Sequence, residues 1–170
     1  IAIDSDPETL NLGTTTSNTS GDVGAKILEG LVYLDPTMTP QGELATSWEI
    51  SPDGKTYTFT LRPNVTWHDG KPFTSADVKF TFDEILAKFH PRTQSLMKQR
   101  IESVEAPDPL KVVIKLKEPF APFLTQMTVF DAPILPKHLY EGTDILKNDY
   151  NLKPVGTGPF KFSEWARGSQ

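Results

Sequence analysis

Hydrophobic and polar residues alternate most clearly over residues 55–62, where every second side chain is apolar and threonines occupy the intervening positions. This period of two predicts a strand with one buried face. The preceding residues 51–54 contain Pro-Asp-Gly, which favours a tight turn, so a shorter partner strand is expected over 48–50. Residues 101–104 and 111–116 predict a second hairpin around 106–109. The chain should therefore contain a sheet with one buried face.

Two other stretches carry apolar residues at helical spacing. The first predicts a helix that starts with Asp22 as its cap and ends near Tyr33, because the residue before Pro36 disfavours helical geometry. The second predicts a helix that is capped by Thr74 or Ser75 and closed by His90 and Pro91. Its buried stripe would comprise Val78, Phe82, Ile85, Leu86 and Phe89.

Shorter elements are expected elsewhere. Prolines near a first helical turn predict short helices over 119–127 and 136–140. An opening strand is predicted over 1–3 and a last strand over 160–162. The polar segment 13–21 has nothing to bury, and composition alone favours a flexible loop there.

Composition excludes several classes of protein. The net charge is −5, and no basic stripe with interleaved aromatic residues indicates a nucleic-acid partner. No apolar run approaches the length of a membrane-spanning helix, about 20 residues. The absence of cysteine excludes disulfides and thiolate metal sites. At 170 residues the chain could form one domain, or one domain and part of another.

Two short motifs suggest chemistry without completing it. His68-Asp69-Gly70 matches the paired ligands of metal-dependent phosphohydrolases, but such sites need further His and Asp ligands, so a structural turn is favoured. Gly156-Thr-Gly-Pro159 resembles a phosphate loop but lacks the Lys and the helix start that such a loop requires. No catalytic set, metal site or cofactor is predicted, and the protein is not expected to be an enzyme.

A set of longer segments, in their order and spacing, resembles the oligopeptide, dipeptide and nickel-binding proteins of ABC transporters, the family 5 extracellular solute-binding proteins. The matching segments are Asp6–Asn11, Lys26–Leu31, Leu44–Trp48, Pro52–Phe59, Trp67–Phe73, Ala76–Val78, Ala121–Leu124 and Pro154–Phe160. The resemblance covers nearly the whole chain but only about the first third of the family's usual length. One departure is Leu12, which stands where the family has Pro after Asn11.

The resemblance implies a mixed α/β (α+β) fold, the N-terminal part of a two-lobed, type II-like periplasmic binding protein with an inserted β-rich subdomain. Residues 1–41 would start lobe I, 42–153 would form the inserted subdomain, and 154–170 would return into lobe I. Lobe II and much of the ligand pocket would lie beyond Gln170. The start at Ile1 fits a processed, exported form or a trimmed sequence equally well.

The resemblance also implies where a ligand would bind. The polar loop before the first helix corresponds to Thr15, Thr16, Ser17 and Asn18, and a second cleft-facing stretch corresponds to Phe130, Asp131 and Ala132. Thr157 is a further candidate. The expected function is capture of a peptide or related small solute and its delivery to the permease subunits of an ABC importer. The protein would act as a monomer in the periplasm or at the cell surface.

Two alternatives remain open from the residues. The threonine-rich loop could belong to a module that recognises a protein or a glycan, and His68 with Asp69 could belong to a metal-dependent hydrolase. The sequence does not distinguish a peptide from an opine, a sugar or a nickel chelate as the ligand.

Overall fold

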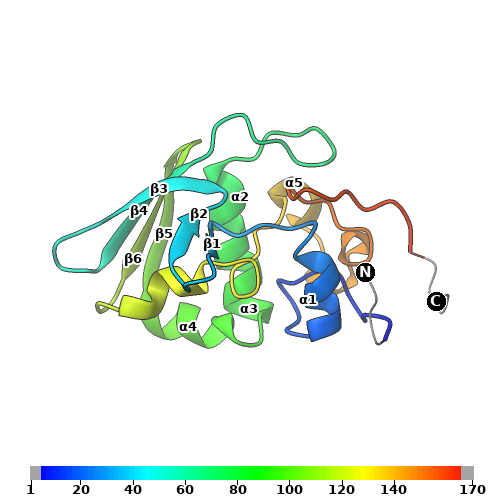
Figure 1. Ribbon diagram of the computed structural model, residues 1–170, viewed down its shortest axis with the longest axis horizontal. Coiled ribbons are helices and arrows are strands. Elements are labelled where there is room, and N and C mark those ends of the chain that lie inside the picture. The colour runs from blue at the N-terminus through cyan, green and yellow to red at the C-terminus, as the bar shows by residue number, and fades with distance from the viewer. Residues whose placement is uncertain (1–4, 166–170) are drawn as a thin grey trace.

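The computed structural model describes residues 5–165 and combines a four-stranded antiparallel sheet with short helices (Figure 1). The strands are β1 (Val32–Leu34), β2 (Pro40–Gly42), β3 (Ala45–Ile50), β4 (Thr56–Leu61), β5 (Ile101–Asp108) and β6 (Lys111–Leu116). The α-helices are α1 (Asn18–Gly24), α2 (Ser75–Phe80), α3 (Ala87–Phe89), α4 (Thr93–Arg100) and α5 (Lys137–Tyr140). A π-helical turn, η1 (Thr81–Leu86), joins α2 to α3, and 3-10 turns form η2 (Ala121–Gln126), η3 (Ile145–Lys147) and η4 (Asp149–Asn151). The opening strand predicted over 1–3 lies outside the described residues.

The sheet has the strand order β3-β4-β6-β5, and both predicted hairpins are confirmed. Tyr57, Phe59 and Leu61 are buried, whereas the threonines between them are not, which confirms the predicted one-sided burial of β4. The second hairpin differs in one respect. Strand β5 continues through Pro107 to Asp108, so the turn that was expected around 106–109 is shorter and lies further along the chain.

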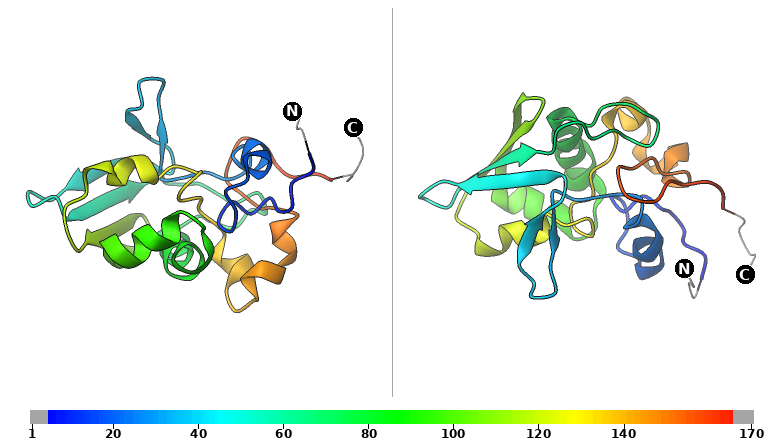
Figure 2. Two further views of the ribbon diagram at one scale, coloured as in Figure 1. Left: turned by 90° about the horizontal axis from the view of Figure 1, so that it is seen from below. Right: turned by 45° about the horizontal axis from the view of Figure 1, so that its top comes forward.

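Helices cover the buried face of this sheet (Figure 2). The main core joins Val78, Phe82 and Leu86, from the continuous helical run α2–η1–α3, to sheet residues that include Phe59 and Ile114. The run starts as predicted with Thr74 as the N-cap. The Asp77 carboxylate accepts hydrogen bonds from the backbone N–H of Thr74 and from that of Lys137, both at 2.9 Å. Asp77 therefore also fixes the start of α5 against α2.

The helix predicted from Asp22 to about Tyr33 is wrong in both its limits. Helix α1 starts earlier, at Asn18, and ends at Gly24, and Val32 already belongs to a β-hairpin that projects from the body (Figure 2). Two close approaches of the backbone explain this. A Cβ atom on Gly24 would lie 2.7 Å from Leu12, and one on Gly30 would lie 2.6 Å from the backbone of Thr128. The apolar residues of this stretch are buried, but they are not buried along one helix face.

The Asp35-Pro36 pair makes the turn of the β1–β2 hairpin instead of ending a helix. Asp35 Oδ1 accepts hydrogen bonds from the N–H and the hydroxyl of Thr37, at 2.8 and 2.6 Å, and from the N–H of Thr39 at 3.0 Å. These donors lower the pKa of Asp35 to about 2. The aspartate is thus an acceptor for its own turn.

The strand predicted over 160–162 is also wrong, since those residues pair with no strand among the described residues. The chain instead follows the segment after α1. Gly158 donates its N–H to the carbonyl of Ile27 at 2.9 Å, and Phe160 donates its N–H to that of Lys26 at 3.1 Å.

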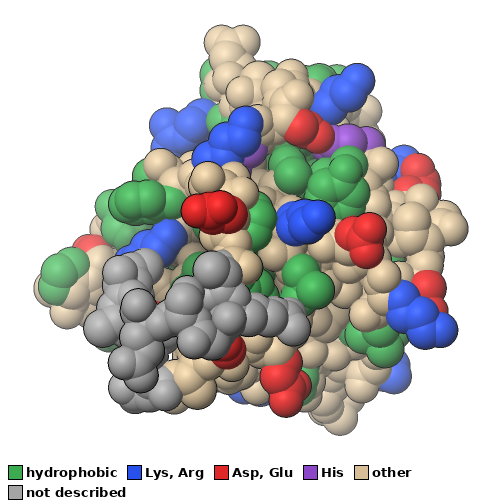
Figure 3. Space-filling view, turned by 90° about the vertical axis from the view of Figure 1, so that its right-hand side faces the viewer, with side chains coloured by type: hydrophobic (Ala, Val, Ile, Leu, Met, Phe, Trp, Pro, Cys, Tyr) green, Lys and Arg blue, Asp and Glu red, His purple; other side chains and the backbone are tan. Residues whose placement is uncertain are grey.

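Figure 3 shows the side of the molecule that lies on the right in Figure 1, and on this face hydrophobic side chains are interspersed with charged ones. No helix over residues 5–165 is both long and apolar enough to cross a bilayer.

Candidate functional site

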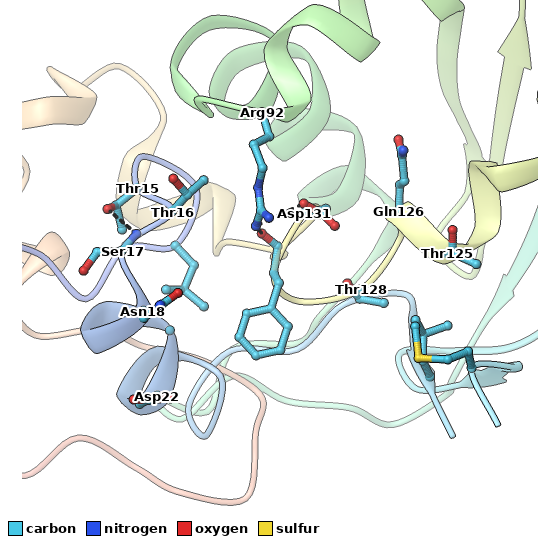
Figure 4. A pocket seen from close by; sticks show the side chains of 15 residues that line it. Thr15, Thr16, Ser17, Asn18, Asp22, Arg92, Thr125, Gln126, Thr128 and Asp131 are labelled. Atoms are coloured by element: carbon cyan, nitrogen blue, oxygen red, sulfur yellow. Dashed lines mark hydrogen bonds and ion pairs between the residues drawn. The ribbon is translucent and has the colours of Figure 1, made fainter. Parts of the chain in front are cut away.

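A pocket of about 610 Å³ lies between α1 with its preceding loop and the segment 125–131 (Figure 4). The start of α4 contributes Arg92, and the β1–β2 hairpin contributes Leu34 and Met38. The polar side chains that line it are Thr15, Thr16, Ser17, Asn18, Asp22, Arg92, Thr125, Gln126, Thr128 and Asp131. Its apolar lining includes Leu12 and Phe130.

The first wall is the threonine-rich loop that contains Thr15, Thr16 and Ser17. Hydrogen bonds of Asn11 hold the base of this loop. The Asn11 side chain is fully buried, accepts the N–H of Gly13 at 2.9 Å, and donates to Oδ1 of Asn151 at 2.7 Å. The carbonyl of Asn11 also accepts the N–H of Thr14 at 3.1 Å. This buried amide pair ties the base of the loop to η4, so the loop is anchored although its residues are small and polar.

The upper part of the loop leaves its side chains facing solvent. Thr16, Ser17 and Asn18 are exposed, and their side chains form no hydrogen bond within the described residues. Thr15 differs, since its hydroxyl accepts the N–H of Ser17 at 3.1 Å (Figure 4). The loop therefore presents free hydroxyl and amide groups, which can both donate and accept hydrogen bonds.

The second wall is the turn that ends in Phe130 and Asp131. The carbonyl of Thr128 accepts the N–H groups of Asp131 and Ala132, at 3.1 and 2.7 Å. Arg92 reaches across from the start of α4, with Nη2 at 3.3 Å from the Phe130 carbonyl and 3.2 Å from Asp131 Oδ1. The Phe130 side chain is half-exposed and faces α1 at Gly21, where an added Cβ would lie 3.3 Å from the ring.

His90 supports this wall from inside the protein. Its ring is fully buried, and Nδ1 accepts the N–H of Thr93 at 3.0 Å. Burial lowers the pKa of His90, although the Asp131 carboxylate opposes that shift, so the imidazole is neutral near pH 7. The hydroxyl of Thr93 in turn donates to the Asp131 carbonyl at 2.5 Å. The α3–α4 junction therefore holds the second wall through its side chains.

Most of the residues that the sequence pointed to meet at this pocket. Thr15, Thr16, Ser17, Asn18, Phe130 and Asp131 line it, from two segments far apart in the chain. Ala132 is fully buried behind the wall, and Thr157 lies outside the pocket, in the turn near His68. Arg92, Thr128 and Gln126 also line the pocket, and they were not among the predicted residues. Thr128 and Gln126 adjoin the predicted stretch, but no pattern in the sequence distinguishes Arg92 from other surface basic residues.

His68 and Asp69 belong to a different region, and each is engaged by another part of the protein. His68 Nε2 lies 2.8 Å from the carbonyl of Gly158, and Nδ1 accepts the N–H of Gly156 at 3.3 Å. Asp69 pairs with His138 at 2.6 Å, and that contact, against the opposing effect of burial, lowers the pKa of the carboxyl. Across residues 5–165 no three His, Cys, Asp or Glu residues are grouped to hold a metal ion. The geometry is that of the turn that the sequence favoured.

The comparisons with known proteins agree on one family. Residues 39–170 match the model described as bacterial extracellular solute-binding proteins, family 5 Middle. A protein of Brucella ovis that is named as an ABC transporter peptide-binding protein is 45% identical over 142 residues. That match covers 79% of this chain and 26% of the relative, so the chain spans about a quarter of the length of this relative.

Solved structures show the same likeness in three dimensions. A dipeptide-binding protein from Pseudoalteromonas sp. SM9913, in complex with Met-Leu, has a TM-score of 0.86 and 30% identity, and the match covers 98% of this chain and 37% of that one. NikZ from Campylobacter jejuni, in complex with Ni(L-His), has a TM-score of 0.83 and 32% identity, with 98% and 33% covered. The predicted fold class, a mixed helix and sheet part of a periplasmic binding protein, is thereby confirmed.

Proposed function

Because the chain belongs to the bacterial extracellular solute-binding proteins of family 5, we propose that it is part of the solute-binding component of an ABC importer. It captures peptides or related small solutes in the pocket between α1 and residues 125–131. The observation that carries this proposal is the gathering of unengaged polar side chains around a cavity of about 610 Å³. That volume falls in the range of small-molecule sites, about 300–1,000 Å³.

The pocket suits binding without chemistry. The free groups of Thr16, Ser17 and Asn18 can pair with the amides of an extended ligand, directly or through water. The half-exposed ring of Phe130 adds an apolar surface on the opposite wall. Among residues 5–165 the pocket lining contains no His, Cys or Lys, and no nucleophile and base are paired within it, so we assign it no covalent step.

The remaining steps of the proposed function concern the whole protein. The pocket would form one wall of a cleft, a second lobe would supply the other, and a hinge would close the two on the solute. Closure would let membrane permease subunits recognise the loaded form. In this proposal residues 1–41 and 154–170 belong to the first lobe, 42–153 form its inserted subdomain, and the protein acts as an exported monomer in the periplasm or at the cell surface.

The test is calorimetry on the full-length protein with a panel of dipeptides, opines, sugars and nickel chelates. A solute that binds is then titrated into Thr16→Trp and Ser17→Trp. Both substitutions fill the pocket from its first wall, so we expect the dissociation constant to rise about tenfold or more, which corresponds to about 1.4 kcal/mol.

The matched control is Ser47→Trp. Ser47 is an exposed residue of β3, outside the pocket lining, and this variant should bind like the parent protein. Unchanged affinity in both loop variants would remove the loop from the site. Failure of every solute class to bind the parent protein would overturn the proposed function itself.

A further inference from the structure

Arg92 is the only basic side chain among the described residues that line the pocket. The other charged lining residues are Asp22 and Asp131, so the charges that surround the cavity sum to −1. The Arg92 side chain is 60% exposed, and it extends from the start of α4 toward the cavity, next to Asp131 (Figure 4). Within the part of the chain that the structure describes, a single guanidinium therefore provides all of the positive charge that a ligand meets in this pocket.

The guanidinium is held on one side and free on the other. Its Nη2 atom bonds the Phe130 carbonyl at 3.3 Å and Asp131 Oδ1 at 3.2 Å. An arginine carries five N–H donors in a planar group, and in the described residues Nε and Nη1 have no hydrogen-bond partner. The side chain is thus oriented by the protein while much of its donor capacity remains available.

Asp131, the residue that orients it, is itself fixed by its backbone. Its N–H donates to the Thr128 carbonyl at 3.1 Å, and its own carbonyl accepts the Thr93 hydroxyl at 2.5 Å. Arg92 and Thr93 are adjacent in the chain, so both ends of the ion pair are set by the same junction before α4. An ion pair this exposed contributes little to stability. The pair is therefore better explained by orientation of the guanidinium than by folding.

We propose that Arg92 is the specificity-determining residue that binds a carboxylate of the solute, with Asp131 as its positioning residue. A planar guanidinium matches a carboxylate in a two-point contact, which a lysine would not reproduce. The two nearby aspartates disfavour ligands with several negative charges, such as phosphate esters, and tolerate a carboxylate on a solute that also carries an amine. The solute class is thus an amino acid derivative or short peptide with a free carboxylate. This inference rests on the proposed function.

The test compares each ligand with its own uncharged analogue, in the full-length protein. Met-Leu and its C-terminal amide are the first probe pair, followed by acid and amide pairs of the other dipeptides and the opines in the panel. We expect the parent protein to prefer the acid by about tenfold or more. Arg92→Gln should weaken binding of the acid to the level of the amide and leave binding of the amide unchanged.

Two further variants separate a positioning role from a general structural role. Arg92→Lys keeps the positive charge but loses the planar group that makes the two-point contact, so this variant should show only part of the parent protein's preference for the acid over the amide. Asp131→Asn should reduce the ratio of acid to amide affinity more than it reduces affinity for the amide. Equal binding of acid and amide by the parent protein, or a preference that survives in Arg92→Gln, would overturn the inference and leave the proposed function intact. If no acid or amide binds but a sugar or a nickel chelate does, this inference fails and the proposed function stands; if no solute in the panel binds, both fail.

Discussion

The turn at His68 and the loop at Thr16 differ in what their side chains do. Both nitrogens of His68 are engaged by the turn at Gly156 and Gly158, and Asp69 is paired with His138. The hydroxyls of Thr16 and Ser17 have no partner in the described residues, although they line a cavity of about 610 Å³. The residue types associated with catalysis hold the fold together, and the ordinary ones line the cavity in which we propose that a ligand binds.

The comparison teaches that residue type is a weaker guide to function than the state of a residue's polar atoms. A histidine whose Nδ1 accepts one backbone N–H, and whose Nε2 faces a carbonyl, has no lone pair left for a metal ion or for substrate. A hydroxyl that is exposed in an anchored loop keeps its donor and its acceptor. Substitutions in the engaged region, the turn at His68, should therefore change the stability of the protein. Substitutions in the free region, the loop at Thr16, should change its affinity for a ligand.

The largest effect is expected at Gly156, in the turn that His68 holds. A Cβ atom there would lie 1.8 Å from the carbonyl oxygen of Ile27, and because that neighbour is backbone it cannot simply rotate away. We expect Gly156→Ala to lower the free energy of unfolding by about 3 kcal/mol, as measured by urea denaturation. Thr157→Ala in the same turn is the control. Its hydroxyl is buried without a hydrogen bond to any described residue, so its loss should change stability by less than about 0.5 kcal/mol. Equal stability of the two variants would contradict the close packing of this turn.

The sequence predicted the sheet well because its signals are local. The alternation along β4 and the Pro-Asp-Gly turn depend on neighbouring residues, and so does the cap at Thr74. Helix α1 was misplaced, because the close approach of Gly24 to Leu12 and of Gly30 to Thr128 depends on segments that are distant in the chain. The strand expected over 160–162 failed for the same reason, since its partner is the backbone after α1.

The candidate site was predictable only in part, and only through the resemblance to a family. Composition favoured a flexible loop over 13–21, and the anchor that holds it, the amide pair of Asn11 and Asn151, joins residues far apart in sequence. Arg92 follows a helix-ending proline and has no sequence signal of its own. Its position in the pocket results from the turn at the start of α4 and from its pairing with Asp131.

An intermediate effect is expected at Glu43, which lies between β2 and β3. The carboxylate accepts the N–H of Gly30 at 2.9 Å, but burial raises its pKa from 4.5 to about 7, with a smaller contribution from the negative charge of Glu29. The folded protein therefore binds the proton more tightly than the unfolded chain does. Stability from this group is full below pH 4.5 and is lost as the pH rises toward 7.

The corresponding measurement is the free energy of unfolding at several pH values. For the parent protein we expect Glu43 to account for a loss of about 1–2 kcal/mol over that range, less than the full shift implies because the side chain is only partly buried. Glu43→Gln keeps an acceptor for Gly30 and should remove this component. Glu49→Gln, at an exposed position of β3, is the control and should follow the parent curve. A Glu43→Gln curve parallel to that of the parent would show that Glu43 does not titrate in this range.

The smallest effect on stability is expected at Ser17, and it tests the free region most directly. Serine at a helix N-cap is ordinarily worth about 1 kcal/mol, because its hydroxyl accepts a backbone N–H. Ser17 occupies the N-cap of α1 without making that bond, so Ser17→Ala should change the free energy of unfolding by less than about 0.5 kcal/mol. Asp77→Ala provides the contrast at α2. Its carboxylate accepts two backbone N–H groups, and its loss should cost about 2 kcal/mol. If Ser17→Ala cost as much as Asp77→Ala, the hydroxyl would be part of the fold, and it would not be free for a ligand.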